Sequence, residues 1–148
     1  MHTEPNLVLG DPRLDQDHAE LLRLTRQLEG ARNKNEVLDA LQALEEHATA
    51  HFAVEDADLR AMKGNDDAQC HVDEHAAVLK SLAETRDWTA QNEDVLKMVN
   101  LVQSLCAELK RWLPEHVQYM DAAVAAYRSK NRFGGVPILF PSRTPRSE

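Results

Sequence analysis

The chain has 148 residues, of which 43% are apolar and 28% are charged, so it fits one ordinary folded domain and not a disordered chain. Its formal net charge of −8 disfavours binding to nucleic acid or to anionic lipid, and no apolar run is long enough to cross a bilayer. The first residues lack the basic and apolar regions of a secretion signal, so we expect a cytoplasmic protein. Cys70 and Cys106 fit no zinc or redox spacing and are expected to be free thiols.

The N-terminal part predicts a loop followed by a helix. A loop is expected over residues 1–14, because Gly10-Asp11-Pro12 is typical of a turn. Asp15 stands where an N-cap would, and a stripe of leucines then continues to Gly30, which ends the first helix.

A second helix follows, with Asn33 or Asn35 as its N-cap. Its apolar stripe continues to Leu59, and Lys63-Gly64-Asn65 is a suitable stop, because Gly64 can adopt a left-handed cap.

Two more helical stripes complete the pattern. Asp66 or Asp67 can cap the third helix, whose stripe fades near Trp88. Asn92 or Asp94 begins a long fourth helix.

Four helices joined by short links predict an all-α protein, an up-down-up-down antiparallel four-helix bundle over residues 15–130. Gly134-Gly135 and several prolines predict an irregular tail over residues 131–148, either docked on the bundle or on a partner, or without function. Pro114 lies inside the fourth helix, where it removes a hydrogen bond to the carbonyl of Lys110 and is expected to kink the helix.

Each predicted helix carries histidine or carboxylate side chains at positions expected to face the interior: His18 in the first, His51 and Glu55 in the second, His71 and His75 in the third, and His116 and Asp121 in the fourth. Pairs four residues apart share one helix face. Burying these groups without partners would cost several kcal/mol per ion, whereas metal binding uses neutral imidazole and ionised carboxylate directly.

The number of these side chains indicates two metal ions. Seven ligands are too many for one tetrahedral zinc, but they suit two six-coordinate ions with Glu55 and Asp121 as bridges. Taken singly, His18 is more typical of a surface or core histidine, and His51 with Glu55 could be an exposed pair. Their joint occurrence on four successive helices favours a metal site.

In these motifs the chain resembles the hemerythrin family, in particular the bacterial hemerythrins, over roughly residues 8–128. The matching segments are Leu14 to Leu21 (with Asp17 where glutamine is usual), His51 to Asp56, His71 to His75, and Trp112 to His116 followed by Asp121.

The resemblance implies a cofactor of two iron ions. One iron is held by His71, His75 and His116, and the other by His18 and His51. Glu55, Asp121 and an oxo or hydroxo group are implied as bridges between them.

That division leaves one coordination position open on the iron held by His18 and His51, where O2 would bind. Leu113 and Trp112 are implied as the walls of a dry O2 pocket, a role compatible with core packing.

His47 lies one turn before His51, where the bacterial family often has tyrosine. It can be an exposed histidine, a polar neighbour of the ligands inside the bundle, or an added or substitute ligand. We favour the first two, because His51 already matches the family and is followed by Phe52.

The spacing from His116 to Asp121 predicts an irregular helix. In a regular helix, five residues rotate a side chain by about 140° from the first. We therefore predict a π-bulge between these two residues, a feature common at functional sites.

The leading hypothesis is a protein that binds O2 reversibly for carriage, storage or sensing, with no catalytic residue. The alternative is a di-iron enzyme with the same site, acting as an oxidase or peroxidase or on NO. A third hypothesis, a metal-free helical interaction module, leaves the buried polar groups without partners.

Overall fold

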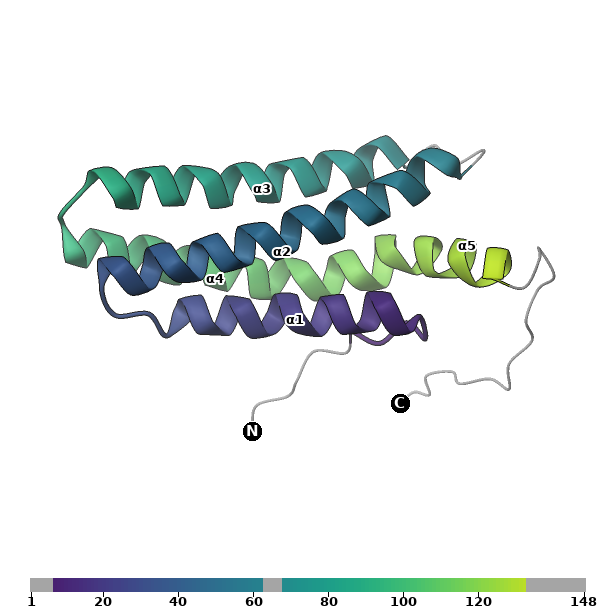
Figure 1. The fold of residues 1–148 in the computed structure, drawn as a ribbon, viewed down its shortest axis with the longest axis horizontal. Helices are drawn as coiled ribbons and strands as arrows, with labels where there is room; N and C mark the ends of the chain where they lie inside the picture. The colour runs from purple at the N-terminus through teal and green to yellow at the C-terminus, as the bar shows by residue number, and fades with distance from the viewer. Residues whose placement is uncertain (1–6, 63–67, 133–148) are drawn as a thin grey trace.

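The structure, a computed structural model, describes residues 7–62 and 68–132. Within these ranges it is all-helical, with α1 (Pro12–Glu29), α2 (Lys34–Ala61), α3 (Ala68–Gln91), α4 (Val95–His116), the π-helix η1 (Val117–Asp121) and α5 (Ala122–Arg132). Figure 1 shows α1, α2, α3 and the continuous run from α4 to α5 side by side along the long axis of a helical bundle. No helix in the described ranges combines the length and apolarity that a membrane span requires.

The first helix begins earlier than the sequence predicted. Asp11, not Asp15, is the N-cap, and its Oδ1 accepts hydrogen bonds of 3.0 and 3.1 Å from two backbone N–H groups of the first turn. Pro12 occupies the first helical position, where its missing N–H costs nothing. The carboxylate of Asp15 instead accepts hydrogen bonds from the N–H groups of Leu9 and Gly10, so it holds the incoming chain against the helix.

The other described helix starts agree with the sequence. Asn33 caps α2 by accepting a 2.9 Å hydrogen bond from the N–H of Glu36, and Asp94 caps α4 through the N–H of Lys97 at 3.0 Å. The third helix, expected to fade near Trp88, continues to Gln91. The predicted stop at 63–65 and the predicted cap at 66 or 67 lie outside the described residues. The tail predicted over residues 131–148 begins too early, because α5 continues to Arg132, and the rest of it lies outside the described residues.

Two apolar clusters enclose a layer of buried polar side chains. The larger cluster extends through the body of the bundle, and the smaller one consists of Leu14, Leu59, Val124 and Ala125. Along α1, His18 lies between Leu14 of the small cluster and Leu21 of the large cluster. The order repeats along α2 around Glu55, so the polar layer is covered by apolar side chains on both sides along the helix axes.

The last helix is tied to the first two by one arginine. Arg128 of α5 donates from Nε to Asp11 Oδ2 at 2.8 Å and from Nη1 to Asp58 Oδ2 at 3.2 Å. Asp11 is 2% exposed and also caps α1, so this contact joins the start of α1, the end of α2 and α5. With Val124 and Ala125 packed in the small cluster, it holds the segment after η1 in place.

Candidate metal centre

Five described elements supply the buried polar layer. Its members are His18 from α1, His51 and Glu55 from α2, His71 and His75 from α3, His116 from the end of α4, and Asp121 from the last position of η1. None of the seven is more than 3% exposed. All seven residues predicted from the sequence are therefore buried together inside the bundle.

The seven side chains form two groups that share both carboxylates. In one group, ligand atoms of Glu55, His71, His75, His116 and Asp121 all lie within 4.8 Å of one another; in the other, the same holds for His18, His51, Glu55 and Asp121. We call these the three-histidine group and the two-histidine group. Each group has enough donor atoms to hold a metal ion, and both carboxylates belong to both groups.

The two oxygens of Glu55 face different groups. Oε1 lies 3.1 Å from Nε2 of His75, in the three-histidine group. Oε2 lies 3.1 Å from Nε2 of His51 and 3.5 Å from Nε2 of His18, in the two-histidine group. One carboxylate thus presents one oxygen to each group, which is the geometry of a bridging ligand.

Asp121 divides in the same way. Its Oδ1 lies 2.7 Å from Nε2 of His71 and 3.0 Å from Nε2 of His116, whereas its Oδ2 lies 2.9 Å from Nε2 of His18. All five imidazoles consequently direct Nε2 toward the carboxylates.

The π-helix η1 brings Asp121 into this arrangement. It covers Val117–Asp121, directly after His116, so the predicted widening of the helix is confirmed. One wide turn separates His116 from Asp121, so both side chains enter the buried polar layer from the same face of the helix. The helix continues through Pro114, and the kink expected there stays a prediction.

Burial and the opposing charges shift the pKa values of these groups strongly. Burial lowers the pKa of His18, but the carboxylates of Asp121 and Glu55 outweigh burial and raise it to about 9. Burial raises the pKa of Glu55 and of Asp121, but the neighbouring histidines outweigh it and lower both. The carboxylates are therefore anionic at neutral pH, and a cation entering the layer competes with protons on His18 and His51, whose pKa values are raised.

Several buried atoms of the layer lack a hydrogen-bond partner among the described residues. They are Nδ1 and Nε2 of His18, Nε2 of His51, both oxygens of Glu55, and Oδ2 of Asp121. Buried polar atoms without partners are rare in native proteins, because each costs about 1–3 kcal/mol. Apart from Nδ1 of His18, these are the atoms that face the interior of the layer, and a metal ion is a partner that suits lone pairs on nitrogen and oxygen alike. The residues present therefore fit a metal centre.

Three further carboxylates hold the outward nitrogens of the histidines. His75 donates from Nδ1 to Asp56 at 2.7 Å, His116 donates from Nδ1 to Glu74 at 3.0 Å, and His51 donates from Nδ1 to Asp17 at 2.9 Å. Each bond fixes the tautomer that leaves the Nε2 lone pair directed inward. Sequence reasoning missed these roles, although all three acidic residues are direct neighbours of a predicted ligand in the sequence.

A small apolar cavity adjoins the layer. Its volume is about 20 Å³, and its lining includes Phe52, Trp112 and Leu113 with leucines and a valine from all four long helices. The ring of Phe52 stacks on His75 at 4.1 Å, and that of Trp112 stacks on His116 at 4.3 Å, which places the cavity beside the histidines. Such a space has room for about one water-sized molecule, and an apolar lining keeps water out.

His47 lies outside both groups of ligand atoms. It is half-buried, and its Nε2 donates a 3.1 Å hydrogen bond to the backbone carbonyl of Asp17. Its ring is parallel to that of His51 at 6.3 Å. Of the three alternatives, the structure supports a polar neighbour of the centre.

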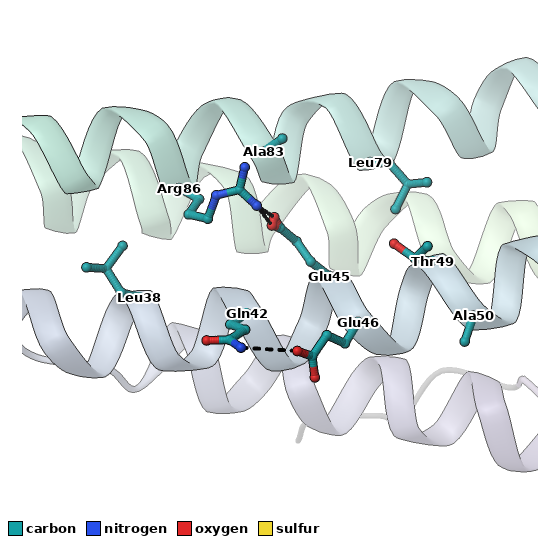
Figure 2. A pocket seen from close by; sticks show the side chains of 9 residues that line it. All are labelled: Leu38, Gln42, Glu45, Glu46, Thr49, Ala50, Leu79, Ala83 and Arg86. Atoms are coloured by element: carbon teal, nitrogen blue, oxygen red, sulfur yellow. Dashed lines mark hydrogen bonds and ion pairs between the residues drawn. The ribbon is translucent and has the colours of Figure 1, made fainter.

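A larger groove of about 830 Å³ lies between α2 and α3 and contains none of the seven residues. Figure 2 shows Arg86 of α3 reaching across it to Glu45 of α2, while Gln42 bonds Glu46 along α2. Among the described residues, the candidate metal ligands thus lie in the buried layer and not in this groove.

Comparison with known proteins agrees with this geometry. The model of the hemerythrin HHE cation-binding domain matches residues 9–127, most of the chain. Searches of curated proteins and of solved structures found no match. The convergence of five imidazoles on two shared carboxylates, together with this family match, places the chain in the hemerythrin HHE cation-binding family.

Proposed function

We propose that this protein binds O2 reversibly at a centre of two iron ions. The observation that carries the proposal is the division of both carboxylates: one oxygen of Glu55 and one of Asp121 face each histidine group. Two groups of histidines that share both carboxylates in this way suit a pair of metal ions better than a single ion.

The three-histidine group would hold one iron and the two-histidine group the other, with Glu55 and Asp121 between them. The mixed imidazole and carboxylate donors suit iron, although they do not exclude other first-row metals. When bound, a pair of ferrous ions supplies two electrons, and the group with fewer histidines leaves more room for a small diatomic ligand.

The protein's own residues prepare this site by orientation and by excluding water. Asp17, Asp56 and Glu74 orient three of the imidazoles through their outward nitrogens. The two apolar clusters and the cavity beside Phe52 and Leu113 keep bulk water from the layer. A dry surrounding favours uptake of an apolar gas.

The fold supports the same proposal. Because α4, η1 and α5 follow one another without a gap, they can serve together as the fourth rod of an up-down-up-down antiparallel four-helix bundle. In such bundles, facing helices hold pairs of metal ions in the core.

The proposal is tested by anaerobic reconstitution with Fe²⁺, elemental analysis, and exposure to O2. We expect about two irons per chain and a visible absorption band that appears with O2 and disappears under vacuum. Iron content well below one per chain would refute the di-iron centre. Irreversible oxidation without a reversible band would refute O2 carriage.

The alternative is a di-iron enzyme with the same residues. The sequence departures at His47 and Pro114 are the features that favour this alternative, since an extra polar group such as His47 near the open position could deliver a proton there. Because His47 is turned to the backbone of Asp17, the structure gives that role no support. Steady turnover of H2O2, O2 or NO well above that of free iron would favour the enzyme.

A further inference from the structure

The two histidine groups differ in how their outward nitrogens are held. In the three-histidine group, two imidazoles have a carboxylate on Nδ1, namely His75 with Asp56 and His116 with Glu74. In the two-histidine group, His51 is the only imidazole with such a carboxylate among the described residues. Nδ1 of His18 is buried without a hydrogen-bond partner in the described part of the chain. The two-histidine group therefore depends on a single outward anchor, Asp17.

Asp17 reaches this position by crossing between helices. It precedes His18 on α1, but its carboxylate extends to α2, where Oδ2 accepts from His51 Nδ1 at 2.9 Å. The carboxylate is 21% exposed, so water can solvate its remaining lone pairs while the imidazole it holds stays buried. A charged acceptor on Nδ1 strengthens the opposite nitrogen as a donor to a metal and resists rotation of the ring.

His47 makes the return connection from α2 to α1. It lies one turn before His51 on α2, and its Nε2–H donates to the carbonyl of Asp17 at 3.1 Å. Asp17 is thus held at its backbone by one histidine while its side chain holds the next. We call these two hydrogen bonds the Asp17–His47 bracket.

We propose that the Asp17–His47 bracket is a positioning device that orients His51 and sets the metal affinity of the two-histidine group alone. This inference rests on the proposed metal centre. It assigns Asp17 and His47 a role in positioning and none in direct ligation. Among the described residues, Nδ1 of His18 has no such partner, so loss of the bracket leaves the two-histidine group without a carboxylate on any outward nitrogen. Loss of Asp56 would still leave Glu74 on His116 in the three-histidine group.

The test measures the two iron equivalents separately. Apo-protein is titrated anaerobically with ⁵⁷Fe²⁺ against a competing chelator, and Mössbauer spectra resolve the two positions. For Asp17→Ala we expect one equivalent to bind about 10-fold to 100-fold more weakly while the other is unchanged. Asp17→Asn keeps an acceptor oxygen without the charge, so it should recover part of the loss.

Asp56→Ala is the matched control, because Asp56 bonds His75 in the same way on the three-histidine side and is exposed to a similar degree. We expect it to change the other Mössbauer signal, and by less. If Asp17→Ala weakens both equivalents equally, or neither, the proposal is wrong. If the wild-type protein itself binds fewer than two irons, the di-iron centre fails, and the bracket proposal falls with it.

His47 is tested in the same titration. His47→Phe keeps a ring beside His51 but removes the donor to Asp17, so it should weaken the same equivalent as Asp17→Ala, by a smaller factor. In the Asp17→Ala background it should have no further effect, because the side chain it positions is gone. Additive losses in the double variant would show that His47 acts independently of Asp17 and would overturn the bracket.

Discussion

The polar layer and the large apolar cluster lie on the same helices and are equally buried, yet their side chains are stabilised differently. Leu28 and Leu41 in the cluster are 0% exposed, as are His18 and Glu55 in the layer. Packing alone stabilises the leucines. In the layer, by contrast, several buried nitrogen and oxygen atoms have no hydrogen-bond partner among the described residues.

This difference indicates that the two regions have separate tasks. The cluster supplies most of the free energy of folding, whereas the layer lowers stability until a ligand occupies it. The cluster should therefore tolerate loss of metal, and the layer should lose metal without loss of the fold. Four experiments test this separation of tasks.

The largest effect is expected from removing a shared carboxylate. Glu55→Gln replaces the anionic bridge between the two groups by a neutral amide, so iron content should fall from about two per chain to one or fewer. Elemental analysis after reconstitution measures this. Glu46→Gln, an exposed change on the same helix, is the control and should retain the wild-type iron content. Helix content by circular dichroism should stay near wild type in both, and unfolding of the Glu55 variant would contradict the separation of tasks.

Shortening the π-helix should also abolish the centre. Deletion of Gln118 removes one residue from η1, so a regular α-turn can form and Asp121 rotates by about 100° relative to His116. Iron content should drop below one per chain. Gln118→Ala keeps the residue count and should bind iron normally. Full iron binding by the deletion variant would show that the π-turn is not what positions Asp121.

A substitution that creates a cavity in the large cluster should have the opposite effect: it should lower stability and leave iron content unchanged. Leu41→Ala removes a fully buried side chain and is expected to lower the free energy of unfolding by about 2–5 kcal/mol. Chemical denaturation measures the loss. Iron content at saturating Fe²⁺ should remain that of the wild type, and a parallel loss of iron would mean that cluster and layer are one cooperative unit.

The smallest effect concerns the two thiols. Burial, together with the nearby Glu29, raises the pKa of Cys106 to about 12, so below that pH the sulfur stays a protonated thiol, whereas Cys70 is exposed. A thiol reagent at pH 8 should label one cysteine per native chain and two after unfolding. Equal labelling rates for both would show that the cluster opens readily near α4.

Much of the centre could be predicted because ligand spacing follows helix geometry. The four-residue steps from His51 to Glu55 and from His71 to His75 place each pair on one face, and the five-residue step to Asp121 predicted the π-helix. Short-range signals also predicted the caps at Asn33 and Asp94.

The remainder depends on contacts between helices. Asp17 is next to His18 in sequence but holds His51, and Glu74 is next to His75 but holds His116. Such partners are set by how one helix is rotated and shifted along its neighbour. The periodicity within a single helix carries no information about that arrangement. The earlier start of α1 at Pro12 could have been predicted, because Asp followed by Pro is itself a helix-start signal.

The contact between Arg128 and Asp11 joins residues 117 positions apart, so it constrains the order of events during synthesis. A chain emerging from the ribosome can form the local cap of its first helix early, but it cannot form the Arg128–Asp11 contact until nearly all of the described bundle has been made. Asp121 belongs to both histidine groups, so neither group has its full set of donors until η1 has been made. A metal ion that needs either full set of donors can therefore be held only after the chain from α1 to η1 has been made.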